Sequence, residues 1–268
     1  MNTLSTVEEQ DGTAEILLDL RGGIATVTLN RPEERNPLGV DFTPRMMSIL
    51  DRLEADSNCS VIVLTGSGKA FCSGADLHRI LGTGDIDMEW QLRLVRGYNQ
   101  VIQRIRGLDL PVIAAVNGPA VGGGAALALA CDIAIASPEA SYFFAFGRIG
   151  ASAADMGCTY LLPRHIGAVR AAHLILTGAT VDAEQGRSLG LFADVVPRAG
   201  LLSAAEHMGQ QIIQAYPRRA AAITKLGLRR GESSSLETCL SYEAIAQNYT
   251  FRTEEHRERL GAFLDRRD

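Results

Sequence analysis

The sequence predicts an α/β protein, and two observations support this. Short apolar segments, typical of strands buried on both faces, alternate with longer segments whose apolar residues recur at helical spacing. Glycine-rich turns directly follow two of these strands. Up to residue 136 the order is strand, helix, strand, helix, strand, helix, strand, which predicts one α/β core without an internal linker.

The first clear strand is predicted over residues 24–29, where apolar and threonine side chains alternate. A helix follows, with Thr43 as its expected N-cap and Pro44 as its first helical residue. Residues 60–65 are a continuous apolar run, which indicates a strand covered on both faces, and Gly66-Ser-Gly68 ends it.

The second half of the core repeats this pattern. A long amphipathic helix is predicted over residues 88–106 and leads into a buried strand over 111–116. The run Gly122-Gly-Gly124 then opens an alanine-rich helix, and residues 131–136 form a further strand. Beyond about residue 189 the pattern is mostly helical, so we expect a core over 1–198 and a helical C-terminal region over 199–268.

Composition excludes several classes of protein. The 268 residues carry a net charge of −5 and contain no long basic stripe, which argues against a nucleic-acid partner. The five cysteines are widely spaced, without a C-x-x-C pair, so we expect neither disulfides nor a metal site. No apolar run approaches the roughly 20 residues of a membrane helix. Residues 1–11 show no basic cluster followed by an apolar segment, so we expect no secretory signal. We therefore expect a cytoplasmic protein without a membrane partner.

Two loops place small residues directly after buried strands, over residues 71–77 and 118–126. Both could bring bare backbone close to a ligand, and the glycine run would aim free N–H groups at a phosphate or an enolate oxygen. Tight packing alone is an equally good reading of such a turn. The spacing lacks the Lys-Ser/Thr ending of a P-loop and does not follow the first strand as a dinucleotide fingerprint would.

Taken with their flanks, these loops resemble the crotonase (enoyl-CoA hydratase/isomerase) family over nearly the whole chain. The matching segments, in order, are Thr28-Leu-Asn-Arg-Pro32 with Asn36-Pro-Leu38, Val63-Leu-Thr-Gly66, Ala70-Phe-Cys-Ser-Gly-Ala-Asp76, Pro111-Val-Ile-Ala-Ala-Val-Asn-Gly118 with Gly122-Gly-Gly124, Cys131-Asp132, Leu176-Thr-Gly178 and Ala262-Phe-Leu264. Several independent blocks in the same order make the resemblance specific.

The resemblance implies a core of repeated ββα turns in a spiral, a helical C-terminal trimerisation region, and trimers that often pair into hexamers. It also implies an acyl-CoA thioester substrate, with coenzyme A as part of the substrate and no further cofactor. Carried over by motif, the backbone N–H groups of Ala75 and Gly123 would form an oxyanion hole. The substrate-binding positions would be Arg35, Asn36, Ser73, Asp76, Leu77, Gly122, Ala126, Gly147 and Arg266, with Lys69 as a further cation for the phosphates.

The sequence departs from the hydratase pattern at the two catalytic glutamates, because the matching positions are Ala126 and Gly147. Asp155 lies in a segment, residues 153–163, that resembles the phenylacetate-pathway isomerase branch, in which this aspartate is the acid/base. One carboxylate suffices for a double-bond shift. We therefore expect an enoyl-CoA isomerase. The alternatives are a hydratase or lyase with an unconventional base, a CoA-ester-binding protein without activity, and an Asp155 that only caps the next helix.

Overall fold

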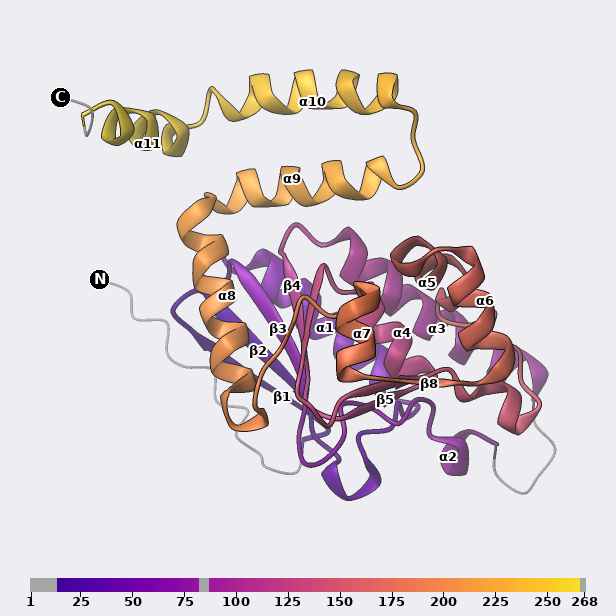
Figure 1. The fold of residues 1–268 in the computed structure, drawn as a ribbon. Coiled ribbons are helices and arrows are strands. Elements are labelled where there is room, and N and C mark those ends of the chain that lie inside the picture. The colour runs from indigo at the N-terminus through magenta and orange to yellow at the C-terminus, as the bar shows by residue number, and fades with distance from the viewer. Residues whose placement is uncertain (1–13, 82–86, 266–268) are drawn as a thin grey trace.

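A six-stranded sheet forms the centre of the molecule (Figure 1). The computed structural model describes residues 14–81 and 87–265. The strand order is β1-β2-β3-β4-β6-β9, with β1 antiparallel to β2 and the other pairs parallel. The bounds are Ile16–Arg21 for β1, Ile24–Leu29 for β2, Val61–Gly66 for β3, Val112–Val116 for β4, Ile133–Ala136 for β6 and Asp194–Val195 for β9.

The strands predicted over 24–29, 60–65, 111–116 and 131–136 correspond to β2, β3, β4 and β6, within one or two residues at each end. The sequence patterns do not single out β1, which forms a hairpin with β2. Gly22 and Gly23 make the two-residue turn with φ values of +55° and +85°. Two consecutive glycines between strands are a hairpin signal, since such a turn needs positive φ at both positions.

One face of this sheet is covered by α1 (Phe42–Ala55), α3 (Met88–Gly107) and α4 (Gly123–Ala130), which share one large apolar cluster with the strands. The predicted N-cap Thr43 is wrong, because α1 begins at Phe42 after Asp41 and Thr43 lies in the first turn. Phe42 is 4% exposed and packs in the core as the first residue of the helix, so the helix begins before Thr43. Pro44 is then the third helical residue, where an N–H would lack an intrahelical partner in any case.

A smaller sheet of order β5-β7-β8 lies beside the first. It consists of β5 (Pro119–Val121), β7 (Ser141–Phe143) and β8 (Thr180–Asp182). The chain passes twice from the large sheet to the small one and then into a helical segment. The first pass is β4, β5 and α4, and the second is β6, β7 and the 3-10 turn η2 (Ala145–Ile149). This is the ββα arrangement expected from the resemblance. The remaining short elements are η1 (Pro32–Glu34), α2 (Leu77–Leu81), α5 (Cys158–Ile166), α6 (Ala168–Thr177), α7 (Ala183–Leu189) and η3 (Arg198–Gly200).

The opposite face of the large sheet is covered by α8 (Leu201–Ala215). Leu201 and Ala205 pack there against side chains of β2, β3, β4 and β6 in a second apolar cluster. The sheet is therefore buried on both faces, in agreement with its continuous apolar strands. The domain boundary expected after residue 198 falls before α8, although α8 packs as part of the core.

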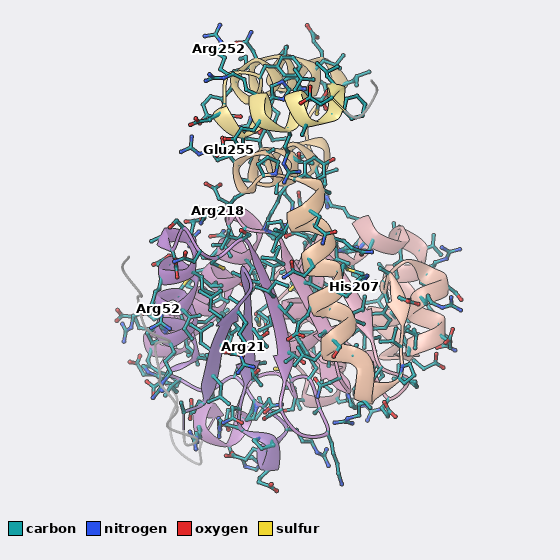
Figure 2. The ribbon with its side chains drawn as sticks, turned by 90° about the vertical axis from the view of Figure 1, so that its left-hand side faces the viewer. Arg21, Arg52, His207, Arg218, Arg252 and Glu255 are labelled. Atoms are coloured by element: carbon teal, nitrogen blue, oxygen red, sulfur yellow. The ribbon has the colours of Figure 1, made fainter. Side chains whose placement is uncertain are left out.

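Beyond α8 the chain leaves the core as a C-terminal arm, residues 218–264. It consists of α9 (Arg218–Gly231), α10 (Leu236–Thr250) and α11 (Glu254–Leu264), which extend away from the sheet (Figure 1). In Figure 2 the labelled Arg252 and Glu255 lie on this arm, away from Arg21 and His207 on the core. Neither α10 nor α11 contains a buried residue.

Candidate functional site

The two glycine-containing loops lie side by side. A parallel bridge joins Cys72 to Ala120, and the Val121 N–H donates to the Cys72 carbonyl at 2.9 Å. The Phe71 N–H donates to the Pro119 carbonyl at 3.1 Å. The loop after β3 and the loop after β4 are thus joined as a short sheet, because their parent strands are neighbours with the same direction.

This approach of backbone to backbone requires glycine at two positions. Gly74 has φ +85°, and a Cβ there would lie 2.7 Å from the Val121 carbonyl oxygen and 3.4 Å from the Gly123 nitrogen. A Cβ on Gly124 would lie 2.4 Å from the Cys72 carbonyl oxygen. Any side chain at either position would separate the loops. The glycines therefore hold Ala75 and Gly123 in one small region.

Both amides predicted to hold an oxyanion lack a protein acceptor within residues 14–81 and 87–265. Gly123 is the first residue of α4, so its N–H has no intrahelical partner and lies at the positive end of the helix dipole. The Gly122 N–H, by contrast, donates to the Phe143 carbonyl at 2.8 Å. The Gly122 amide is therefore already used and cannot serve as a free donor.

Leu38 holds the other amide. Its N–H donates to the Gly74 carbonyl at 2.8 Å and its carbonyl accepts from the Asp76 N–H at 3.0 Å. Ala75 lies between these two bonds, so in extended backbone its own N–H points to the side opposite Leu38. Sequence reasoning did not identify Leu38 as a site residue, and an ordinary buried leucine gives no signal of this role.

Asp155 reaches the same region through its neighbour. The Met156 sulfur lies 2.7 Å from the point that a Cβ on Gly123 would occupy, so Met156 packs directly against this glycine. Met156 is buried and has φ +46°, a strained conformation for a residue with a side chain. This backbone strain lies in the turn that contains Asp155.

The Asp155 carboxyl group is half-buried, and its Oδ1 is buried without a hydrogen-bond partner in the described part of the chain. Burial raises the pKa of Asp155, and the Met156 backbone amide offsets this only in part. Its side chain does not cap α5, because the cap is Gly157 with φ +77° and no side-chain bond is made there. Only the Asp155 carbonyl is used, as acceptor for the Cys158 N–H at 2.9 Å.

The two positions that match the hydratase glutamates carry no ionisable group. Ala126 is buried in α4, one turn after Gly122. Gly147 is exposed in η2, and a Cβ there would meet only open space. Phe146 lies beside it, with ring atoms 3.7 and 3.8 Å from the point where a Cβ on Gly122 would sit. A phenyl ring therefore borders the glycine run.

The expected nucleotide-binding segments also meet. The Ser73 N–H donates to the Arg35 carbonyl at 2.9 Å, and the Arg35 side chain is exposed with the backbone at φ +65°. Asn36 is only 2% exposed. Its amide nitrogen donates to the carbonyls of Ser67 and Ala70, each at 2.9 Å, and its oxygen accepts from the Arg31 N–H at 2.8 Å. Asn36 thus braces the loop with its own side chain.

The other predicted binding residues differ in their surroundings. Asp76 is 4% exposed and forms an ion pair with Arg31, whose Nη1 lies 2.9 Å from Asp76 Oδ2. Leu77 is exposed at the start of α2. Arg266 lies outside the described residues. Arg31 was not a predicted site residue, and its pairing with Asp76 joins the loop after β2 to the loop after β3.

Among the described residues, no group of His, Cys, Asp and Glu side chains is arranged to hold a metal ion. In the same residues, no helix combines the length and apolarity needed to cross a membrane. The site itself offers the two free amides, the α4 dipole and the Asp155 carboxyl group.

Comparison with known proteins agrees with this arrangement. The family model described as enoyl-CoA hydratase/isomerase matches residues 19–268. A protein of Mycobacterium leprae, named probable enoyl-CoA hydratase echA12, is 36% identical over 252 residues, covering 91% of this chain and 85% of that protein. The 1,2-epoxyphenylacetyl-CoA isomerase of Escherichia coli is 35% identical over 254 residues, covering 94% and 96%.

The fold is shared with solved structures as well. The crystal structure of an enoyl-CoA hydratase from Bacillus anthracis superposes with a TM-score of 0.89 at 32% identity, covering 94% of this chain and 97% of that one. The family model, the similar sequences and the solved structure all indicate the same family. The chain therefore belongs to the crotonase superfamily of enoyl-CoA hydratases and isomerases, enzymes that act on acyl-CoA thioesters.

Proposed function

We propose that the protein is an enoyl-CoA isomerase that moves a double bond by proton transfer through Asp155. The observation that carries this proposal is the Asp155 carboxyl group, which has a buried oxygen without a partner and precedes Met156, the residue packed against Gly123, while Ala126 and Gly147 occupy the hydratase glutamate positions. A hydratase needs one group to activate water and one to protonate carbon. An isomerase needs a single carboxylate.

The proposed reaction balances without a co-reactant. The Asp155 carboxylate removes a proton from C2 of a 3-enoyl thioester, and the electron pair spreads into a dienolate with charge on the thioester oxygen. The N–H groups of Ala75 and Gly123 donate hydrogen bonds to that oxygen, and each donor stabilises the transition state by about 3 kcal/mol. The double bond moves from C3–C4 to C2–C3, and the same carboxyl group returns the proton to C4.

The surroundings of Asp155 favour this role. Its raised pKa makes the carboxylate a stronger base than an ordinary aspartate, which lowers the cost of removing a proton from carbon. The Met156 sulfur packs against Gly123, so the turn that contains Asp155 contacts one of the two proposed donors to the enolate oxygen. Coenzyme A, as part of the substrate, would lie along Arg35 and Ser73, and no other cofactor takes part.

We also propose that the protein assembles as a homotrimer or as a dimer of trimers. Leu236 and Ile245 of α10 are 75% and 74% exposed, and Phe251, before α11, is 53% exposed. Large apolar side chains spread along an arm that does not bury them are typical of a surface that meets other subunits.

The test of function supplies a 3-enoyl-CoA and measures the formation of the conjugated 2-enoyl product. We expect wild-type turnover, and a loss in kcat of about a hundredfold or more in Asp155→Asn, because the amide cannot accept the proton. Asp19→Asn is the matched control, since Asp19 is exposed on the edge strand β1 and, within the described part of the chain, its carboxylate pairs with Arg21 alone. That variant should keep full activity.

A parallel assay with a 2-enoyl-CoA measures hydration and separates the alternatives. Hydration that survives Asp155→Asn, together with no isomerisation by the wild type, would support a hydratase or lyase with a different base. Binding of both thioesters without turnover of either would support a CoA-ester-binding protein. The names of the relatives include hydratases and an isomerase, so the two assays together are needed to identify the reaction.

A further inference from the structure

Tyr98 is a buried tyrosine on the inner face of α3 whose hydroxyl reaches a site loop. It is 3% exposed and shares this face with aliphatic side chains such as Val101 and Ile105. The hydroxyl donates to the Leu38 carbonyl at 2.8 Å, with the Gly39 carbonyl at 3.1 Å as a second acceptor. A tyrosine within an otherwise aliphatic stripe needs such a partner when it is buried. This bond ties α3 to the backbone that holds Ala75.

Leu38 contacts both predicted oxyanion donors. Its backbone bonds to Gly74 and Asp76 bracket Ala75, and so set the direction of the Ala75 N–H. Its side-chain Cδ1 lies 3.3 Å from the point that a Cβ on Gly123 would occupy. A small shift of Leu38 would therefore move one amide and loosen the packing at the other.

The Tyr98 hydroxyl is not needed to satisfy these carbonyls. The Leu38 carbonyl already accepts from the Asp76 N–H at 3.0 Å, and the Gly39 carbonyl from the Phe42 N–H at 3.2 Å. The ring itself packs against Phe42, with a centroid distance of 6.1 Å. Removing only the hydroxyl would thus leave no carbonyl unpaired and no cavity in the core. What would be lost is the tie between α3 and the Leu38 backbone.

The hydroxyl also remains a donor throughout the working pH range. Burial raises the pKa of Tyr98, and the negative charge of Asp76 acts in the same direction.

We propose that Tyr98 is a positioning residue for the oxyanion hole, which acts by holding Leu38 and through it the Ala75 amide. The proposal rests on the proposed function, since it assumes that Ala75 and Gly123 hold a thioester enolate. Tyr98 itself contacts backbone carbonyls. Its effect is therefore expected on the stabilisation of the enolate rather than on the binding of coenzyme A.

The experiment compares two ligands on wild type, Tyr98→Phe and Tyr242→Phe. Acetoacetyl-CoA can bind as its enolate, which absorbs in the near ultraviolet, whereas butyryl-CoA offers the same thioester without forming that enolate. Tyr242 is the matched control, because its hydroxyl donates to the Ile223 carbonyl at 3.1 Å on the C-terminal arm, away from the loops. Thermal melting of each variant accompanies the binding measurements.

We expect Tyr98→Phe to weaken enolate binding about tenfold and to lower kcat by a similar factor, because small misplacement of a donor is costly at the reacting centre. The affinity for butyryl-CoA and the KM should stay within about twofold, since ground-state binding does not depend on the donor geometry. Tyr242→Phe should match the wild type with both ligands.

Equal weakening of both ligands in Tyr98→Phe would overturn the inference, because it would show a general structural role. No change in either ligand would overturn it as well. If wild type gives no enolate absorbance with acetoacetyl-CoA, the proposed oxyanion hole itself fails. That outcome is distinguishable, because it appears before any substitution is made.

Discussion

At the scale of single residues, Asp155 combines two properties that an ordinary surface aspartate lacks. Its Oδ1 is buried without a partner, and burial raises its pKa. Helix capping would account for neither, because the side chain makes no cap bond to α5. A carboxyl group with a raised pKa and one buried oxygen free to accept a proton is instead what a proton-transfer role requires.

The raised pKa predicts a pH-dependent stability difference between wild type and Asp155→Asn. Between the unfolded pKa of aspartate, about 3.9, and its higher folded pKa, the folded protein binds more protons than the unfolded chain. The contribution of Asp155 to stability therefore falls as pH rises through this window. Since asparagine cannot ionise, we expect the variant to be more stable than wild type at pH 7 and equal to it below about pH 3.

Urea denaturation at pH 7 and at about pH 3 measures this difference. Asp19→Asn provides the comparison for a carboxyl group that is exposed and paired with Arg21. A destabilised Asp155→Asn at neutral pH would contradict the prediction, because it would mean that the folded state favours the charged carboxylate.

At the scale of elements, sequence periodicity predicted the long and regular pieces well. The strands β2, β3, β4 and β6 and the helix α3 follow from clear apolar patterns. The strands β5, β7 and β8 do not, since each has three residues, which is too short for a period to be seen. Their positions depend on pairing between segments distant in sequence, and that pairing turns the core into the ββα arrangement.

The candidate site divides in the same way. Motif position alone indicated Ala75, Gly123 and Asp155, and their surroundings leave the two amides and one Asp155 oxygen unpaired. The role of Asn36 could not be inferred, because its internal bonds join backbone more than 30 residues away. Nor does the glycine run reveal which of its amides is used by Phe143. These facts depend on the contact between loops, which a local pattern does not contain.

The contact between the two loops predicts a specific effect of Gly74→Ala. The alanine backbone would have to keep φ +85°, and its methyl group would lie 2.7 Å from the Val121 carbonyl oxygen. At Gly190, where φ is +81°, the methyl group of an alanine would meet open space. Positive φ alone costs about 1 kcal/mol, and overpacking adds about 1–3 kcal/mol. We expect Gly74→Ala to lose about 2–4 kcal/mol in urea denaturation and most of its activity, against about 1 kcal/mol and full activity for Gly190→Ala. Equal effects at both positions would contradict a close contact.

At the scale of the whole molecule, a buried cluster of charged side chains helps to attach the C-terminal arm to the core. Lys225 of α9 is 6% exposed and donates to the carbonyls of Ile105 and Leu110, at 2.9 and 2.8 Å, while its Nζ lies 2.9 Å from Asp132. Arg229 pairs with Asp132 at 2.6 Å and also reaches the Ala130 carbonyl at the end of α4. The arm is thus fixed to the ends of α3 and α4, the helices that carry Tyr98 and Gly123.

Beyond this cluster the arm exposes apolar side chains, and a trimer would cover them. Two such side chains, Leu236 and Ile245, would contribute about 2 kcal/mol each on burial, and a glutamate in their place would also carry a charge into the interface. We therefore expect the wild type to sediment as a trimer or hexamer, and Leu236→Glu combined with Ile245→Glu to dissociate. Met88→Glu is the control, because Met88 is 81% exposed at the start of α3, outside the arm. A monomeric wild type, or a double variant that stays fully assembled at micromolar concentration, would show that the arm does not form the subunit interface.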